Sequence, residues 1–206
     1  MFAQDLVPLD LGGAKLFKGM LGAAAQSELV EQVREVVARA PLFHPQTASG
    51  KQMSVRMTSS GRLGWVSDRR GYRYEPRHPE GTDWPPIPPL ALDVWQALSG
   101  VPRDPDSCLV NFYAEGAKMG MHQDRDEGDF SWPVISISLG DDALFRIGGV
   151  ERKGPTQSHW LTSGDVLVLG GPARLAYHGV DRIRYGSSAL LKSSGRLNLT
   201  LRAVDQ

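Results

Sequence analysis

The sequence predicts an α+β fold that is mainly β, with two helices ahead of a β-sandwich or jelly roll. The first half carries two helical apolar patterns, whereas short apolar runs separated by glycine-rich turns follow Cys108. Many short strands with regular turns are typical of sandwiches and jelly rolls. Helices that precede such strands are expected to cover one side of the sheet.

Two segments, residues 23–40 and 90–99, have the three- and four-residue apolar spacing of amphipathic helices. Pro41 is expected to end the first helix, because the residue before a proline disfavours the helical conformation. Gly100 is placed to end the second one. The two helices flank a segment rich in Gly, Arg, Tyr and Pro, in which we expect only short strands.

The β-rich half contains six strand candidates with turn-forming residues between them. These candidates are residues 109–113, 134–139, 144–147, 165–169, 175–178 and 197–204. The chain shows no repeat, no low-complexity segment and no linker that would divide it. We therefore expect one domain over residues 1–206, with its β core at about 108–204.

The composition excludes several classes of protein. The 206 residues carry a formal net charge of zero, so no overall field attracts nucleic acid or a membrane surface. Cys108 is the only cysteine, which excludes a disulfide framework and a cysteine-based zinc site. No apolar stretch approaches the length of a membrane span. These features predict a cytoplasmic monomer with no membrane association and no obligate protein partner.

The charge is nevertheless distributed unevenly. Residues 51–77 contain seven Lys and Arg residues against Asp68 and Glu75, with three aromatic residues among them. A solvated basic face is the simplest interpretation of such a run. The alternative is a nucleic-acid contact, in which aromatic rings stack on bases while cations meet the phosphates.

His122-Gln123-Asp124 is the most informative tripeptide of the chain, together with the distant His178. In a strand, His122 and Asp124 would point to the same side. We expect His178 at the end of an apolar strand, where an unpaired histidine would be costly. Two histidines and one carboxylate bind one face of Fe(II) and leave positions for dioxygen and a co-substrate. Zinc is the alternative metal for this ligand set.

The segment Arg196–Arg202 alternates strictly between polar and apolar side chains. It is either a half-exposed strand or a strand whose polar face lines an anion pocket. Two arginines on one face can each bind a carboxylate, as a small dicarboxylate such as 2-oxoglutarate requires. Asn111 and Tyr113 also share a strand face and can donate hydrogen bonds to the same molecule.

These residues, taken with further motifs in the same order, make the chain resemble the AlkB family of Fe(II)/2-oxoglutarate-dependent DNA dealkylases. The resemblance covers about residues 51–202. The motifs that carry it are Met53-Ser54-Val55, Gly61 to Trp65, Gly71 to Tyr74, Asn111 to Ala114, Gly116 to Lys118, His122 to Glu127, Ile135 to Gly140, Gly164 to Val166, Tyr177 to Gly179 and Arg196 to Arg202.

The resemblance implies a double-stranded β-helix, or jelly roll, with a nucleotide-recognition lid at about residues 50–89. It implies iron ligation by the catalytic residues His122, Asp124 and His178. Arg196 would bind the distal carboxylate of 2-oxoglutarate and Arg202 the carboxylate next to the iron. The co-substrate site implied in full consists of Asn111, Phe112, Tyr113, Arg196, Asn198, Thr200 and Arg202.

The resemblance also implies a substrate site. An alkylated base would stack between Trp65 and His122, with Asp126 at its exocyclic amine. Tyr72, Arg73, Tyr74 and Arg152 would contact the phosphates and sugars of the flanking strand. A carboxylate favours a cationic base, as N1-methyladenine and N3-methylcytosine are, and an alkyl group on a base-pairing nitrogen is accessible only in single strands or flipped bases.

The implied reaction is dealkylation of DNA, preferably single-stranded, with release of formaldehyde, succinate and CO2. Double-stranded DNA and RNA are alternative substrates, since stacking and phosphate contacts are shared by both nucleic acids. An oxygenase for a protein or small molecule and a non-enzymatic jelly-roll binding module are further alternatives. One departure from the family concerns Leu169, which stands where its best-known member has tryptophan; we expect different packing of the pocket there.

Overall fold

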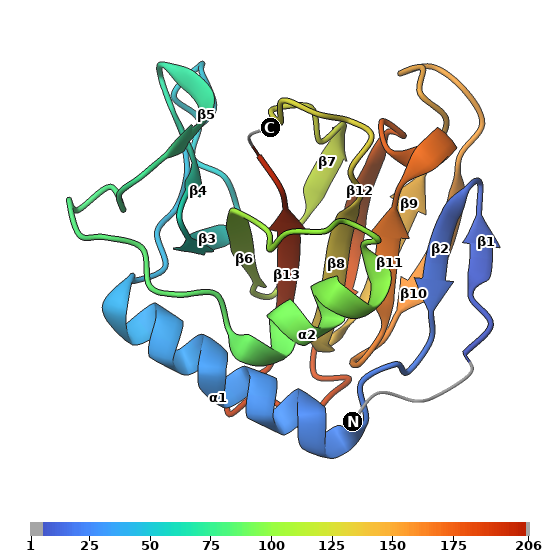
Figure 1. Cartoon of the computed structure of the whole chain (residues 1–206), viewed down its shortest axis with the longest axis horizontal. Helices are drawn as coiled ribbons and strands as arrows, with labels where there is room; N and C mark the ends of the chain where they lie inside the picture. The colour runs from blue at the N-terminus through green and yellow to red at the C-terminus, as the bar shows by residue number, and fades with distance from the viewer. Residues whose placement is uncertain (1–5, 205–206) are drawn as a thin grey trace.

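The computed structural model describes residues 6–204, and these contain two α-helices and three antiparallel β-sheets (Figure 1). The helices are α1 (Ala23–Arg39) and α2 (Pro89–Leu98), and a short 3-10 helix spans Gly171–Ala173. The strands are β1 (Leu9–Leu11), β2 (Ala14–Phe17), β3 (Arg56–Gly61), β4 (Gly64–Asp68), β5 (Gly71–Glu75), β6 (Ser107–Tyr113), β7 (Met119–His122), β8 (Val134–Gly140), β9 (Asp142–Ile147), β10 (Gln157–Leu161), β11 (Val166–Leu169), β12 (His178–Arg184) and β13 (Arg196–Arg202).

The two larger sheets form the jelly roll. The major sheet has the strand order β1-β2-β11-β8-β13-β6-β3, and the minor sheet has the order β10-β9-β12-β7. A single cavity is lined by side chains of both sheets, so the sheets face each other across it. Because most neighbours in each sheet, such as β8 and β13 or β7 and β12, are not consecutive in sequence, the chain winds back and forth between the sheets, which is the double-stranded β-helix that the sequence predicts.

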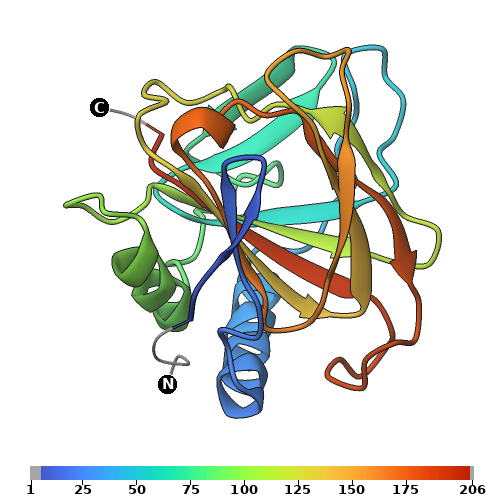
Figure 2. The same ribbon diagram turned by 90° about the vertical axis from the view of Figure 1, so that its right-hand side faces the viewer.

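Helices α1 and α2 cover the outer face of the major sheet (Figure 2). The buried side of α1, which includes Leu29 and Val33, packs with Val94 and Trp95 of α2 against apolar side chains of β6, β8 and β13. The first helix ends where predicted: Ala40 is extended, with φ −131° and ψ 90°, ahead of Pro41. The second begins at Pro89, whose missing N–H costs nothing in the first turn.

Strand β13 explains the strict alternation of its sequence. Leu197, Leu199 and Leu201 belong to the core shared with the helices, whereas Arg196 and Asn198 face the cavity. All seven residues of the strand are buried. The half-exposed strand considered from sequence is therefore wrong: both faces are covered, one by apolar packing and one by the opposite sheet.

The hairpin β4-β5 forms a separate two-stranded sheet that stands beside the open end of the jelly roll (Figure 1). Its base is packed tightly, since a side chain on Gly64 would lie 2.2 Å from the indole of Trp84. The preceding strand β3 is not part of this hairpin. It pairs with β6 and extends the major sheet.

Some predicted elements differ from the observed ones. The strand predicted at 175–178 is wrong, because the 3-10 turn and the residues after it lead into β12, which begins at His178. The hairpin β1-β2 precedes both helices, so the order of helices first and strands later holds only in part. Within residues 6–204 no helix is both long enough and apolar enough to span a membrane.

Candidate functional site

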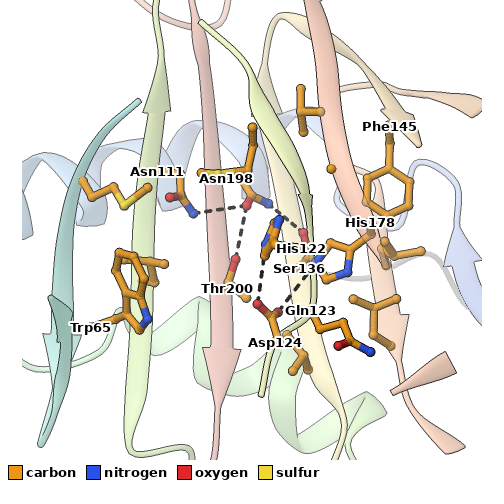
Figure 3. A pocket seen from close by; sticks show the side chains of 18 of the residues that line it. Trp65, Asn111, His122, Gln123, Asp124, Ser136, Phe145, His178, Asn198 and Thr200 are labelled. Carbon is orange, nitrogen blue, oxygen red and sulfur yellow. Dashed lines mark hydrogen bonds and ion pairs between the residues drawn. The ribbon is translucent and has the colours of Figure 1, made fainter. Parts of the chain in front are cut away.

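The site lies in a cavity of about 330 Å³ between the major and minor sheets. One side is formed by polar residues of β6, β8 and β13, and the other by β7, β9 and β12. Trp65 of the β4-β5 hairpin lines the cavity (Figure 3). Asp126 also lines it. The cavity therefore joins the three parts of the molecule in which sequence analysis placed candidate residues.

His122, Asp124 and His178 converge in this cavity, and one potential ligand atom of each lies within 4.8 Å of the others (Figure 3). His122 ends β7 and pairs directly with His178, the first residue of β12. Gly179 allows this pairing, because a Cβ there would lie 2.6 Å from the carbonyl oxygen of Met119. The Nε2 atoms of His122 and His178 are 3.6 and 3.8 Å from the two carboxylate oxygens of Asp124.

The placement of Asp124 differs from the prediction that it shares a strand with His122. Strand β7 stops at His122, and Asp124 lies two residues further on in an irregular segment. The pleat of a strand therefore does not orient this carboxylate. The carboxylate is instead contacted by Arg202, whose Nη2 is 2.9 Å from Oδ2 of Asp124.

Each histidine is held with its Nε2 towards the ligand cluster. Nδ1 of His122 donates to the carbonyl oxygen of Gly120 at 2.9 Å, and Nδ1 of His178 donates to that of Ala176 at 2.9 Å. Such bonds fix the tautomer in which Nε2 carries the lone pair, and they orient the ring. The three side chains thus present two imidazole nitrogens and a carboxylate to one point.

The protonation states of the cluster suit metal binding. Burial raises the pKa of Asp124, but the charge of Arg202, aided by the two histidines, outweighs it and holds this pKa well below its ordinary value. Burial lowers the pKa of His178 to about 4, although Asp124 partly opposes the shift. A deprotonated carboxylate and a neutral imidazole are the ligand forms that a metal requires.

The polar face of β13 supplies the second part of the site. Arg196 is 1% exposed, and its Nη2 donates to Oγ of Ser138 at 2.9 Å. Its Nε and Nη1 have no hydrogen-bond partner, and neither have Nε and Nη1 of Arg202, although that Nε is within ion-pair distance of Glu127. Burying unpartnered guanidinium donors is costly. The donors of Arg196 and Arg202 therefore fit an anion with two carboxylates, as 2-oxoglutarate has.

A hydrogen-bonded cluster is centred on Asn198 of the same strand (Figure 3). Oδ1 of Asn198 accepts from Thr200 at 3.2 Å and from Asn111 at 3.4 Å. Nδ2 of Asn198 donates to Oγ of Ser136 at 2.7 Å. Oδ1 of Asn111 has no partner, which leaves a polar atom available in the cavity.

Tyr113 also lines the cavity, and the guanidinium carbon of Arg196 lies 5.4 Å from the centre of its ring. Phe112 does not join this group. It lies on the opposite face of β6 with the helix-side core, under the guanidinium of Arg56. Its alternation with Asn111 and Tyr113 makes this placement unavoidable.

Trp65 and Asp126 meet at the mouth of the cavity. Nε1 of Trp65 donates to Oδ2 of Asp126 at 3.0 Å, and the indole stacks on Tyr72 with ring centres 5.4 Å apart. Tyr72 is 53% exposed. The sequence predicted all three residues for substrate contacts, and they form one cluster beside the metal ligands.

The other predicted substrate residues lie further from the cavity. Arg73 donates within the hairpin to Asp68 and Glu75, and the hydroxyl of Tyr74 donates to Glu127 at 2.6 Å. Arg152 is exposed in the loop between β9 and β10. That loop approaches the site, since Nε2 of Gln123 donates to the carbonyl oxygen of Val150 at 3.2 Å.

Sequence reasoning assigned no role to Glu127 and Arg174, two buried residues adjacent to the metal ligands. In the sequence, Glu127 stood out only as the last residue of the His122 to Glu127 motif. Arg174 follows a glycine- and proline-containing turn, where an arginine is ordinarily a surface residue. Burial of a charged residue beside a turn is a tertiary property, and the sequence offers no local signal for it.

The fold and these two clusters define a non-haem iron oxygenase that uses a dicarboxylate co-substrate. The sequence model of the 2OG-Fe(II) oxygenase superfamily matches residues 13–202, and the chain belongs to that superfamily. Its cofactors are Fe(II), 2-oxoglutarate and O2. The predictions of an iron- and 2-oxoglutarate-dependent dioxygenase and of a jelly roll are thereby confirmed.

Within the superfamily the similarity is to AlkB proteins. The chain is 59% identical to an alpha-ketoglutarate-dependent dioxygenase AlkB homolog of Caulobacter vibrioides, over 92% of this chain and 87% of the relative. It is 40% identical to the alpha-ketoglutarate-dependent dioxygenase AlkB of Escherichia coli, over 95% and 91% of the two chains. The solved structure of OsALKBH1 matches with a TM-score of 0.78 and 33% identity, covering 96% of this chain and 99% of that one.

Proposed function

We propose that the protein removes alkyl groups oxidatively from bases of nucleic acid, with N1-methyladenine and N3-methylcytosine in single-stranded DNA as substrates. The observation that carries the proposal is the Trp65–Asp126 pair at the mouth of the metal cavity. An aromatic ring and a carboxylate there suit a flat, cationic base. The names of the AlkB relatives, and of a nucleic acid dioxygenase from Mus musculus that is 30% identical over 59% of this chain, support it.

In this proposal His122, Asp124 and His178 hold the iron. Arg196 holds the distal carboxylate of 2-oxoglutarate, and Arg202 holds the carboxylate next to the metal. When bound, Fe(II), 2-oxoglutarate and O2 would supply an oxidation that converts 2-oxoglutarate into succinate and CO2, with one oxygen atom of O2 in succinate and the other on the alkyl carbon. The hydroxylated base then loses its hydroxyl proton as the nitrogen–carbon bond breaks, so that formaldehyde leaves, the electron pair returns to the ring nitrogen and the uncharged base is restored.

The hairpin β4-β5 acts as the nucleotide-recognition lid in this proposal. Trp65 stacks on the flipped base opposite His122 and excludes water from the cavity, while the free oxygen of Asp126 accepts from the exocyclic amine. Exposed cations in and beside the lid, among them Arg69, Arg70 and Arg152, meet the phosphates. We place the enzyme in the cytoplasm as a monomer, a proposal that the single buried Cys108 and the zero net charge support.

The deciding experiment incubates the purified protein with Fe(II), 2-oxoglutarate and air. The substrates are one oligonucleotide sequence made as DNA and as RNA, single- and double-stranded, with either methylated base. We expect formaldehyde and restored adenine or cytosine, fastest with single-stranded DNA. Asp124→Ala, which loses a metal ligand, is the matched inactive control.

Faster repair of RNA than of DNA would replace the proposed substrate with RNA, the alternative that the same stacking and phosphate contacts allow. If 2-oxoglutarate were consumed with no loss of methyl groups from any oligonucleotide, the proposal of a nucleic-acid dealkylase would be wrong, whereas the oxygenase assignment would stand.

A further inference from the structure

Asp124 is a metal ligand in an irregular segment that no strand supports. Residues 123–133 link β7 to β8 without regular secondary structure. A ligand in such a segment needs other contacts to keep its orientation, because a metal site tolerates little displacement of its ligands. The contacts of this segment therefore show which residues prepare the metal site.

Arg174 contacts four residues of this segment, Asp124, Glu127, Phe130 and Trp132. Its side chain is 3% exposed and reaches the segment at several points. Nη1 donates to the main-chain carbonyl of Asp124 at 2.6 Å, and Nε donates to that of Trp132 at 2.8 Å. The guanidinium also lies over the ring of Phe130, 5.3 Å from its centre. One side chain thus holds both ends of the loop that carries the ligand.

The remaining nitrogen of Arg174 leads to the co-substrate arginine. Nη2 of Arg174 donates to Oε2 of Glu127 at 2.9 Å, and Oε1 of Glu127 lies 3.2 Å from Nε of Arg202. Arg202 in turn lies 2.9 Å from Oδ2 of Asp124 through Nη2. The contacts close a ring: Arg174, Glu127, Arg202, the carboxylate of Asp124, and back to Arg174 through the main chain of Asp124.

The charges in this ring balance before any cofactor binds. Two guanidinium groups meet two carboxylates, each residue being less than a tenth exposed. Glu127 is required in this balance, because its carboxylate pairs with Arg174 and also lies 3.2 Å from Nε of Arg202. Nη1 of Arg202 is left without a hydrogen-bond partner and is available to a carboxylate.

We propose that Arg174 is a positioning residue of the metal centre. It fixes the main chain of Asp124 directly and the guanidinium of Arg202 through Glu127, so the metal ligand and the co-substrate arginine are oriented before either cofactor arrives. The proposal rests on the iron and 2-oxoglutarate roles assigned above and is independent of the nucleic-acid substrate. It involves no contact of Arg174 with metal or co-substrate.

The test is the affinity of the full chain for Mn(II), followed by the loss of the free-ion electron paramagnetic resonance signal, in Arg174→Met. Losing partners that orient metal ligands typically costs about 10–100-fold in metal affinity. We expect a dissociation constant for Mn(II) raised in that range, and a raised constant for 2-oxoglutarate on the metal-loaded protein. Arg174→Lys, which keeps the charge beside Glu127, should restore part of the loss.

The double variant Arg174→Met/Glu127→Gln separates positioning from general stability. Removing both charges of a buried pair is often neutral for folding, whereas removing one is not. We expect the double variant to recover thermal stability and still bind Mn(II) weakly, because the bond to the Asp124 carbonyl stays absent. Arg146→Met is the matched control, since it removes an arginine–aspartate pair, at 2.6 Å with Asp181, and neither of these residues lines the cavity.

Wild-type affinity for Mn(II) and 2-oxoglutarate in Arg174→Met or in the double variant would overturn the proposal. If neither Arg174→Met nor the double variant folded, Arg174→Lys would decide alone, because a lysine cannot reach both carbonyl groups and Glu127 at once. Wild-type affinity of Arg174→Lys for Mn(II) and 2-oxoglutarate would likewise overturn the proposal. None of these measurements uses nucleic acid, so their failure is distinct from failure of the proposed dealkylation.

Discussion

Arg196 is a buried charge that favours binding of the co-substrate but destabilises the protein when no co-substrate is bound. Burial lowers the pKa of its guanidinium, and two of its three nitrogens have no hydrogen-bond partner. A protein retains such a group when a ligand compensates for it, since replacement by an apolar side chain is often neutral or stabilising. Substitution of Arg196 is therefore a more specific test of co-substrate binding than substitution of a metal ligand is.

Arg196→Met should weaken 2-oxoglutarate binding and leave the cofactor-free protein at least as stable. Hydrogen bonds to charged groups contribute about 1.5–3 kcal/mol, or roughly a 10–150-fold change in dissociation constant. Calorimetric titration of 2-oxoglutarate into Mn(II)-loaded protein measures the first effect and thermal unfolding the second. An exposed arginine of β12, in Arg182→Met, serves as control; equal 2-oxoglutarate affinity in both variants would contradict the assignment of Arg196.

Trp65 offers a second prediction, because its ring and its N–H have separate roles. Trp65→Ala should weaken binding of a methylated oligonucleotide by about 1–3 kcal/mol, the contribution of one stacked base. Trp65→Phe keeps an aromatic face and loses only the bond to Asp126, so it should retain most of the affinity. Fluorescence anisotropy with labelled oligonucleotides measures both, and similar losses in the two variants would show that stacking is not the main contribution.

At the scale of elements, the hairpin β4-β5 is held by ion pairs across its exposed turn. Arg73 contacts Asp68 at 2.9 Å and Glu75 at 2.5 Å. Hydrogen bonds from Arg73 hold the pKa of Asp68 well below its ordinary value of 3.8. A lowered carboxyl pKa in the folded state stabilises the hairpin above the ordinary pKa, and this contribution disappears as the pH falls through the lowered value.

Arg73→Gln should therefore raise the pKa of Asp68 towards 3.8, so that the Asp68 side chain is protonated at a higher pH than in the wild type. Nuclear magnetic resonance titration of the side-chain carboxyl follows this directly. Arg77→Gln is the control, since Arg77 pairs with Asp83 instead. An unchanged Asp68 titration in Arg73→Gln would show that the pair is not formed in solution.

Elements with strong periodicity were predictable from sequence, whereas those stabilised by pairing were not. The stripe of α1 and the alternation of β13 identify both elements within a residue or so of their observed bounds. Strand β7 is Met-Gly-Met-His, which has little β-propensity, and it forms because β12 pairs with it. Strand β12 carries several charged residues on its outer face and so lacked the apolar signal of the predicted strands.

The sequence predicted that His122 and Asp124 lie together, but the structure brings them together in a different way. Strand alternation was expected to align His122 with Asp124, yet Asp124 follows the strand and is oriented by Arg174 and Arg202. The three residues were expected together from the His-x-Asp spacing, the position of His178 after an apolar run and the family resemblance, and the structure brings them together. The supporting residues could not be found this way, since their role depends on contacts between segments far apart in sequence.

At the scale of the whole molecule, cofactor binding should be visible as stability. At a free concentration of 100 times its dissociation constant, a ligand adds about 2.7 kcal/mol, and a chain of this size gains roughly 2–4 °C per kcal/mol. We therefore expect 2-oxoglutarate with Mn(II) to raise the unfolding midpoint by about 5–11 °C. Glutarate, which lacks the keto oxygen, should give a smaller shift, and an equal shift would argue against chelation of the metal.

Strand β13 lies at the centre of the major sheet with one face towards the helices and the other towards the cavity. Substitutions along residues 196–202 should therefore have one of two effects, and the two effects should alternate along the strand. Substitutions at 197, 199 and 201 would lower the amount of protein in the cell, because they disturb the apolar core. Substitutions at 196, 198 and 200 would leave abundance nearly normal and remove the activity, so a mutational scan read separately for abundance and function would oscillate with a period of two residues. A substitution at 202 would lower abundance as well, because it leaves the buried carboxylates of Asp124 and Glu127 without this guanidinium.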